Sequence, residues 1–419
     1  MAQGITSTWP SAARQVVLCT IRDPATGSEI DQVLTTRFDA PRSYTGEDMV
    51  ELSCHAGVAV TTAVLNAFIE QGAREAAPGE FTQRAVLHGK LDILQAEAIG
   101  DLVEARTTAA RGLAISQMHG LLSQQIDALR ATILHIEALL AYDLDFPEED
   151  DGPIPRARIA DAATKVIEAL SNLLSTAPLA EVATEGALVV IAGAPNTGKS
   201  SLFNALLGSR RAIVTEVPGT TRDAIEARLD TATWPLRLVD TAGLRETRDI
   251  VERLGIEVSE QHIRKAHVIL GASDDDDQLP VVLETLRQLS EVPIIPVRTK
   301  IDRQATASVT HTADAIRVSA VTGEGLDRLL QAIDTTLEQT LGEVPVDRPV
   351  LTRTRHRVAL EVAQREMRFF SEAWESGSVP PVVAAVHVRS ASAALDELIG
   401  SVDVDDILAR VFSTFCVGK

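Results

Sequence analysis

The spacing of apolar residues divides the N-terminal third of the chain into two kinds of pattern. Alternation of apolar and polar residues near the start predicts three strands, followed by a helix over 60–71. The expected strands are Gln15–Ile21, Ile30–Phe38 and Met49–Cys54. From Lys90 to about Tyr142, apolar residues instead recur every three or four positions, which is typical of long amphipathic helices. The sequence therefore predicts a mixed α and β region followed by a helical one.

A second change of pattern comes near the middle of the chain. An acidic link with prolines over Asp145–Pro153 leads to a helix over Ala157–Leu174, and a buried type of strand follows over Ala187–Ala192. From there to about Leu341 strands alternate with helices, which is typical of a doubly wound parallel sheet. The tail over 351–419 is helical again. We therefore expect an α/β domain inserted into a helical domain.

One loop of the α/β stretch has the pattern of a phosphate-binding site. The residues Gly193-Ala194-Pro195-Asn196-Thr197-Gly198-Lys199-Ser200 fit G-x4-G-K-[ST], between a predicted strand and a helix over 201–207. Glycines let backbone N–H groups close around phosphates, and the helix N-terminus adds positive partial charge. We expect Lys199 to reach the β- and γ-phosphates and Ser200 to bind Mg²⁺. The alternative is a glycine turn before an ordinary helix.

Four more short strings follow in the order that a GTPase needs. Gly219–Asp223 offers Thr221 as a second Mg²⁺ ligand, and Asp240–Gly243 offers a carboxylate for the water shell of the metal at a strand end. Thr299–Asp302 presents Asp302 to the hydrogens that distinguish guanine from adenine, and Ser319–Val321 would close the base pocket. Each string is weak alone, but five strings in order at strand ends predict a guanine nucleotide site. The residues expected to bind GTP are Asn196, Thr197, Gly198, Lys199, Ser200, Ser201, Thr215, Glu216, Val217, Pro218, Gly219, Thr220, Thr221, Asp240, Thr241, Ala242, Gly243, Thr299, Lys300, Asp302, Ser319, Ala320 and Val321.

The group that orients water for hydrolysis differs from that of the small Ras-like GTPases. Those proteins place a glutamine directly after Asp-x-x-Gly, whereas this chain has Leu244, which cannot orient water. Glu252, in the polar stretch that follows, offers a carboxylate; the alternative is a solvated helix residue. Asn196 also has two readings, as an amide that closes the loop or as a ligand of a monovalent cation beside the phosphates.

Charge and cysteine content exclude several classes of protein. The chain has 39 Lys and Arg against 59 Asp and Glu, a formal net charge of −20, which argues against binding nucleic acid by bulk charge. Its three cysteines lack metal-ligand spacing, so we expect neither a disulfide framework nor a zinc site. The N-terminus lacks the pattern of a signal peptide, and no apolar run approaches the roughly 18 residues of a membrane helix. We expect a cytoplasmic protein without a membrane span.

Two short charged stretches have no role in the nucleotide motifs. The acidic run Asp274–Asp277 is expected to follow a strand end as a solvated loop. Arg353, Arg355, His356 and Arg357 form the most basic short stretch. A solvated helix start is the leading interpretation of this basic stretch, and contact with a phosphate group is the alternative.

Further strings outside the nucleotide motifs are distinctive. They are Pro41–Asp48, Pro78–Ala85, Gly89–Ala98, Asp145–Asp150 and Phe415–Lys419. With these strings the chain resembles the family of the tRNA-modifying GTPase MnmE, also called TrmE, over almost its whole length from about residue 40. The resemblance implies an α+β multidomain protein with a Ras-like P-loop GTPase domain over 186–343. That domain would be inserted into a helical domain over 90–185 and 344–419, after a folate-binding, dimerising N-terminal domain over 1–89.

The resemblance also implies how GTP is hydrolysed. The family is activated by K⁺ through dimerisation of its G domains, and Asn196, Thr215, Val217 and Thr220 match its K⁺ ligands. Glu252 matches the residue that orients the attacking water, so Glu252 and Lys199 are the expected catalytic residues. A cation beside the phosphates can neutralise charge in the transition state, as an arginine finger does.

The implied reaction modifies tRNA. The family forms homodimers and acts with the FAD protein MnmG, as a heterotetramer, to add an aminomethyl or carboxymethylaminomethyl group to C5 of the wobble uridine. Either 5-formyl- or 5,10-methylene-tetrahydrofolate would supply the one-carbon unit, and Glu51, Lys90 and Lys419 match the folate-contacting positions. Cys416 is either a small buried apolar residue or a residue with a chemical role near the folate.

Departures from the family pattern leave a second function open. The family usually begins with about thirty further residues, including a strand and a glycine-rich turn with an arginine that helps to bind folate. Without them, the alternative function is a GTP-switch assembly or regulatory factor that has lost folate chemistry. Thr299 stands where the family usually has Asn, which predicts a weaker contact to the base while Asp302 is retained.

Overall fold

The structure is a computed structural model, and it describes residues 5–145, 155–209, 225–240, 262–303, 315–342, 347–377 and 380–399. The chain forms two compact units. The first unit comprises Met1–Gly100, Met118–Pro153 and Pro380–Lys419, and the second comprises Asp101–Gln117 and Ile154–Val379. None of the described helices is long and apolar enough to cross a membrane. The division into domains at 89, 185 and 343 does not coincide with these units and stays a prediction.

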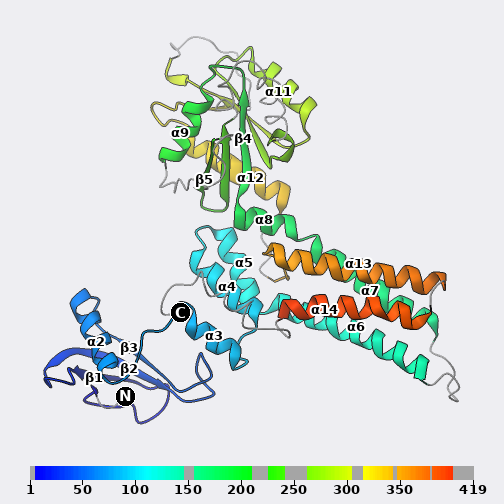
Figure 1. The fold of residues 1–419 in the computed structure, drawn as a ribbon. Coiled ribbons are helices and arrows are strands. Elements are labelled where there is room, and N and C mark those ends of the chain that lie inside the picture. The colour runs from blue at the N-terminus through cyan, green and yellow to red at the C-terminus, as the bar shows by residue number, and fades with distance from the viewer. Residues whose placement is uncertain are drawn as a thin grey trace, which may run out of the picture. The chain divides into compact units, whose positions relative to one another are not determined.

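The first unit begins with an antiparallel sheet in the order β1-β2-β3. Its strands are β1 (Val16–Arg22), β2 (Glu29–Phe38) and β3 (Met49–Ser53), followed by helix α2 (Val58–Glu70) (Figure 1). The buried side chains of β1 and β2 alternate along each strand, so that Cys19, Ile21 and Val33 form a core with Val64 of α2. The three predicted strands and the helix are confirmed, with ends that differ by one or two residues.

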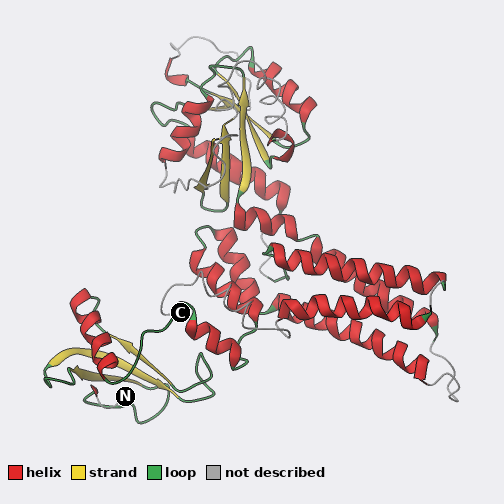
Figure 2. Cartoon of the chain, viewed as in Figure 1, coloured by secondary structure: helices red, strands yellow, loops and turns green. Residues whose placement is uncertain are grey.

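The rest of the first unit is helical. Helices α3 (Glu80–Leu87) and α4 (Ile93–Glu104) follow the sheet, and α6 (Leu121–Asp145) packs against α14 (Pro381–Ile399) (Figures 1 and 2). Two ion pairs fix this contact: Arg130 with Asp396, and Arg389 with Glu137, the latter at 2.7 Å. Residues far apart in the sequence therefore form one helical pair. This agrees with the prediction that helical segments lie before and after the α/β stretch.

The second unit contains a six-stranded sheet in the order β5-β6-β4-β7-β8-β9. The strands are β4 (Ala187–Gly193), β5 (Ile225–Asp230), β6 (Pro235–Asp240), β7 (Val268–Ser273), β8 (Ile294–Arg298) and β9 (Ile316–Arg317). Neighbouring strands are parallel except for β5, which pairs antiparallel with β6. The predicted parallel sheet is confirmed apart from this edge strand.

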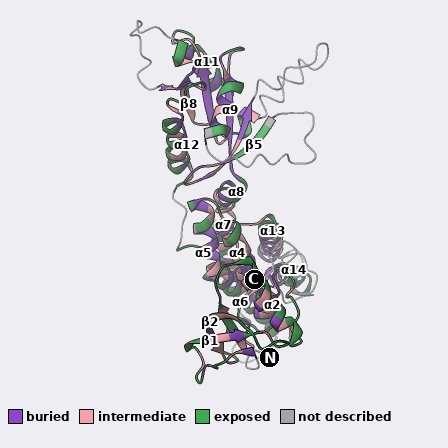
Figure 3. Ribbon diagram, turned by 90° about the vertical axis from the view of Figure 1, so that its left-hand side faces the viewer, coloured by how far each residue is buried: buried purple, intermediate pink, exposed green. Residues whose placement is uncertain are grey.

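Both faces of this sheet are covered, which explains why β4 is apolar throughout. Alternate residues of β4 enter two cores: Val189 and Ile191 join one core with α9 and α12, and Val190 joins another with α11. Figure 3 shows that the interior of this sheet is buried and that its covering helices have exposed outer faces. The covering helices are α8 (Ala177–Glu185), α9 (Lys199–Ser209), α11 (Leu279–Leu289) and α12 (Leu326–Leu341). This arrangement is the doubly wound fold that the alternation of strands and helices predicts.

The sheet is inserted between two helices that pack together in the second unit. Helices α7 (Arg156–Leu174) and α13 (Thr354–Ser376) contact each other along their length, while α5 (Thr108–Met118) belongs mostly to the same unit. The Arg156 guanidinium lies 4.5 Å from the centre of the Trp374 ring, and the indole N–H of Trp374 donates to the Arg156 carbonyl at 3.1 Å. The residues of the sheet therefore lie in sequence between α7 and α13, the two helices that pack together.

The basic stretch 353–357 is a helix start, as predicted, but it is not simply solvated. Helix α13 begins at Thr354, and the side chain of His356 is buried. Arg353 forms an ion pair with Asp101 at 2.6 Å. The interpretation of a solvated stretch is therefore wrong for these two side chains.

Candidate nucleotide-binding site

The predicted phosphate loop joins β4 to α9 at the carboxyl end of β4. Gly193 passes so close to β7 that a Cβ at this position would lie 2.1 Å from the Ala272 carbonyl oxygen. Asn196 has a φ of 63°, in the left-handed region that asparagine tolerates better than most residues. The backbone of the loop is therefore fixed by close approach to the next strand, as the glycine pattern predicts.

Lys199 lies folded over this loop. Its Nζ donates hydrogen bonds to the carbonyl oxygens of Gly193, at 3.1 Å, and Ala194, at 2.8 Å. The Thr197 hydroxyl also donates to the Ala194 carbonyl, at 2.9 Å. The ammonium is buried and held by backbone oxygens, and phosphate oxygens of a nucleotide offer it stronger, charged acceptors.

The predicted magnesium residues of the described part lie at the same edge of the sheet. Asp240 is the last residue of β6 and pairs in register with Ile191, two residues before Gly193 in the parallel neighbour β4. Its side chain is buried, whereas Ser200 is exposed in the first turn of α9. A carboxylate at the end of β6 and a hydroxyl at the start of α9, the helix that follows β4, are oxygen ligands of the kind that Mg²⁺ takes.

The predicted base-recognition loop contacts the phosphate loop directly. The Thr299 hydroxyl donates to the Thr197 carbonyl oxygen at 2.5 Å, and Lys300 Nζ donates to the Asn196 carbonyl oxygen. Thr299 stands where Asn is expected. Its short side chain still reaches the phosphate loop, so the two loops remain linked by a hydrogen bond. Residues that are about one hundred positions apart in sequence are thus in contact, and that these two loops form one nucleotide site stays a prediction.

The two halves of the predicted base pocket also meet. The Ser319 hydroxyl donates to Asp302 Oδ1 at 2.7 Å and accepts the backbone N–H groups of Val321 and Thr322 at 3.2 and 3.1 Å. Ser319 is buried, while Asp302 and Val321 are exposed and accessible to a base. The serine therefore orients the carboxylate that is expected to read guanine.

The acidic run follows a strand end, as predicted, but two of its side chains are ion-paired. Asp274 lies 2.7 Å from Lys300 Nζ, and Asp276 lies 2.9 Å from Arg298 Nε. Both partners belong to β8 or to the base-recognition loop that follows it. The expectation of a solvated loop is wrong for these two aspartates, because a run of like charges in sequence says nothing about the cations that the fold brings to it.

Several predicted site residues lie outside the part of the chain that the structure describes. They are Thr215, Glu216, Val217, Pro218, Gly219, Thr220, Thr221, Thr241, Ala242, Gly243, Glu252, Cys416 and Lys419. The second magnesium ligand, three of the four K⁺ ligands and the water-orienting glutamate are among them, and their roles stay predictions.

The two described folate candidates belong to the first unit. Lys90 is exposed, and its Nζ donates to the Pro41 carbonyl oxygen at 3.1 Å. Glu51 is exposed on β3, on the opposite face from the core. Lys90 therefore lies against the loop that begins at Pro41.

That loop is tied to α3 by a charged network that sequence reasoning did not find. Arg84 pairs with Glu47 at 3.2 Å and with Glu80 at 2.7 Å, and Arg74 pairs with Glu80 at 2.6 Å. The hydrogen bonds from Arg74, from the Ala77 N–H group and from Arg84 lower the pKa of Glu80 from its ordinary value of 4.5 to about 2. The strings Pro41–Asp48 and Pro78–Ala85 contain Glu47, Glu80 and Arg84, while Arg74 lies outside both, and the sequence does not show that these charges pair.

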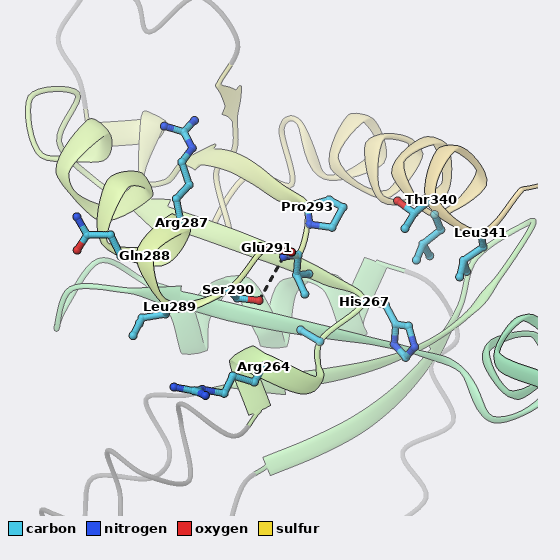
Figure 4. A pocket seen from close by; sticks show the side chains of 13 residues that line it. Arg264, His267, Arg287, Gln288, Leu289, Ser290, Glu291, Pro293, Thr340 and Leu341 are labelled. Atoms are coloured by element: carbon cyan, nitrogen blue, oxygen red, sulfur yellow. Dashed lines mark hydrogen bonds between the residues drawn. The ribbon is translucent and has the colours of Figure 1, made fainter.

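A cavity of about 690 Å³ lies elsewhere in the second unit (Figure 4). Its lining comes from residues that precede β7 and β8 and from the end of α12, so it lies at the opposite ends of these strands from the phosphate loop. His267 lines it and accepts the Leu188 N–H group through Nδ1 at 2.9 Å, while burial lowers the pKa of this histidine. The cavity is not part of the nucleotide site.

Comparison with known proteins decides the family. A family model described as the MnmE helical domain matches residues 93–416, and one described as the N-terminus of the GTP-binding protein TrmE matches residues 1–90. The chain belongs to the MnmE family. Together the two matches of this family cover nearly the whole chain, in agreement with the distinctive strings of the sequence.

Individual MnmE proteins support this assignment. The tRNA modification GTPase MnmE of Aquifex aeolicus is 40% identical over 400 residues, which are 94% of this chain and 88% of that protein. That of Methylobacterium radiotolerans is 41% identical over 410 residues, 97% of this chain and 90% of its own. The crystal structure of the G domain of the T. maritima FeoB iron transporter aligns with 36% of this chain at 26% identity, with a TM-score of 0.28 that is too low to carry an argument.

Proposed function

We propose that this protein is a GTPase that acts in tRNA modification. Membership of the MnmE family supports this function. The observation that carries it is the contact between the phosphate loop and the base-recognition loop through Thr299 and Lys300. A shared site for phosphates and base, with Asp302 oriented by Ser319, has the geometry to select a guanine nucleotide.

Magnesium fits the residues at the phosphate loop. Ser200 would bind the ion directly, Asp240 would hold its water shell, and Thr221 is the second expected ligand. When bound, Mg²⁺ neutralises charge on the β- and γ-phosphates. Lys199, now held by backbone carbonyls, would exchange them for phosphate oxygens.

Potassium is the proposed activator, and Glu252 the proposed water-orienting base. Asn196 supports this proposal, because its side chain is exposed at the turn of the phosphate loop, where its amide oxygen is accessible to a cation. Thr215, Val217 and Thr220 would complete the set of oxygen ligands. A monovalent cation in that position supplies positive charge next to the phosphates, and dimerisation of the G domains would complete its site.

The proposed modification takes place on C5 of the wobble uridine of tRNA. The protein would act in the cytoplasm as a homodimer with an MnmG-type FAD protein, and tetrahydrofolate would supply the one-carbon unit. The net charge of −20 supports a role for the partner in holding tRNA, since the chain is not a basic protein. Lys90 is an exposed ammonium that suits the carboxylates of folate, with Glu51 and Lys419 as further contacts and Cys416 as a possible neighbour.

GTP hydrolysis in matched salts tests the proposal. We expect the purified protein to hydrolyse GTP faster in KCl than in NaCl at equal ionic strength, and a deletion strain to lack the modified wobble uridine. Equal rates in both salts, together with fully modified tRNA in the deletion strain, would contradict the proposed function. Titration of the protein with 5-formyltetrahydrofolate separates the modifying enzyme, which binds it, from a regulatory GTPase that has lost folate chemistry.

A further inference from the structure

The acidic run after β7 reaches the nucleotide site through one lysine. Lys300 Nζ contacts two groups: the Asp274 carboxylate, at 2.7 Å, and the Asn196 carbonyl oxygen of the phosphate loop. Lys300 therefore connects the end of β7 to the phosphate loop. Ion pairs with directed hydrogen bonds of this kind are among the stronger polar contacts in proteins.

A second ion pair, between Asp276 and the buried Arg298, holds the same acidic run. Arg298 at the end of β8 is buried, and its Nε donates to Asp276 Oδ1 at 2.9 Å. Its Nη1 also donates to the Thr299 carbonyl oxygen at 3.2 Å, and the Thr299 N–H group donates to the Ser273 carbonyl oxygen at 2.9 Å. The loop that carries Asp274 and the loop that carries Lys300 are therefore fixed to each other.

The backbone of Lys300 has an unusual conformation that surrounding contacts must hold in place. Lys300 has a φ of 55°, a left-handed conformation that is uncommon for residues other than glycine, asparagine and aspartate. Such a conformation persists where surrounding contacts hold it. The ammonium is only partly exposed, and its hydrogen bond lowers the pKa of Asp274, so the aspartate is charged at neutral pH.

We infer that Asp274 is a positioning residue for guanine nucleotides, which holds Lys300 across the phosphate loop without touching the nucleotide itself. This inference rests on the proposed GTPase function. Lys300 links the base-recognition loop to the phosphate loop, and GDP and GTP share the base and the first two phosphates. Loss of the Asp274 carboxylate should therefore weaken the binding of GTP and of GDP by the same factor. The rate of hydrolysis at saturating GTP should stay unchanged.

Replacement of the carboxylate by an amide of the same size tests the inference. For Asp274→Asn we expect KM for GTP and Kd for GDP to rise about tenfold, and kcat to stay within about twofold. Asp277→Asn is the matched control, because Asp277 is exposed in the same run and offers its backbone N–H group, not its side chain, to Asp275. We expect this control to keep the wild-type KM. An unchanged KM in Asp274→Asn would overturn the inference.

Two further variants separate positioning from a general effect on folding. Asp274→Glu keeps the charge, and we expect it to restore most of the affinity that Asp274→Asn loses. In a Lys300→Met background, Asp274→Asn should have no further effect, because the residue acts through the lysine. Additive losses in the double variant would contradict the inference. If the wild-type protein did not bind GDP at all, the proposed GTPase function would be wrong. This outcome is distinct from an unchanged KM in Asp274→Asn, which would overturn only the inference about Asp274.

Discussion

The two sheets of the molecule bury their residues in different ways. The six-stranded sheet of the second unit is covered on both faces, and Val190 of β4 is fully buried in the core beneath α11. In the three-stranded sheet of the first unit, Val16 of β1 is 60% exposed, because α2 covers only the opposite face. In parallel sheets covered on both faces, ligands bind at the carboxyl ends of the strands, and the phosphate-loop motif lies at that end of β4.

The two regions also connect their distinctive strings by different contacts. In the second unit, Thr299, Lys300 and Lys199 donate to backbone carbonyls of the phosphate loop. In the first unit, Arg84 joins the two strings through the Glu47 carboxylate, while its second ion pair, with Glu80, lies within one string. Bonds to the backbone set the shape of a loop, whereas ion pairs that are partly exposed, such as Arg84 with Glu47, depend more on pH and salt.

The largest effect is expected from a methyl group at Gly193. In Gly193→Ala the new Cβ would meet the Ala272 carbonyl oxygen at 2.1 Å, so the phosphate loop or β7 must move. We expect GTP binding to be lost, measured by titration with a fluorescent GDP. Gly208→Ala, in α9 where a Cβ meets nothing within 4 Å, is the control and should bind nucleotide normally. Normal binding by Gly193→Ala would contradict the described geometry of the loop.

A change of base specificity is the next largest effect. Asp302→Asn removes the carboxylate that Ser319 orients and replaces an acceptor by an amide. We expect GTP affinity to fall about a hundredfold and affinity for xanthosine triphosphate to rise, because the amide matches the changed edge of that base. The measurement is competition between the two nucleotides. An unaltered preference for GTP would show that Asp302 does not read the base.

The same substitution in both sheets sharpens the comparison of their burial. Val190→Ala should lower the free energy of unfolding by about 2 kcal/mol, since it leaves a cavity in a core. Val16→Ala should change it by about 0.5 kcal/mol or less, because the side chain is exposed. Urea unfolding, followed by separate probes of each unit, checks both values. Equal losses would mean that the outer face of the three-stranded sheet is covered in solution.

The smallest effect is the pH dependence from Glu80. Its pKa in the folded protein is about 2, below the ordinary value of 4.5, so its stabilising contribution is present above about pH 5 and is lost as pH falls toward 2. We expect the difference in stability between wild type and Glu80→Gln to shrink over that range. Thermal unfolding at several pH values measures it. A difference that is independent of pH would contradict the network with Arg74 and Arg84.

Much of the fold could be predicted because its signals are local. The run of apolar residues in β4, the alternation in β1 and β2, and the glycine pattern of the phosphate loop each depend on residues close in sequence. The order of the nucleotide motifs then predicted one site at one edge of the sheet. Thr299 contacts the loop after β4 and Ser319 contacts Asp302, so these motifs are adjacent in the structure, while their role in binding a guanine nucleotide stays a prediction.

What the sequence did not predict depends on partners that are distant along the chain. Strand β5 is antiparallel at the sheet edge, and although Ile225–Asp230 alternates apolar and polar residues as a strand does, this local pattern does not show the direction in which β5 pairs with β6. The run Asp274–Asp277 is indistinguishable from a solvated loop until Lys300 and Arg298 are placed beside it. The pairing of Arg84 with two glutamates is hidden for the same reason.

The central claim is that the phosphate loop and the base-recognition loop form one guanine nucleotide site. Calorimetric titration of the purified protein with GDP and with ADP, in the presence of Mg²⁺, tests it most directly. The account predicts that GDP binds at least about a hundredfold more tightly than ADP, because Asp302 pairs with hydrogens that adenine lacks. Equal binding of GDP and ADP, or no binding of either, would contradict it.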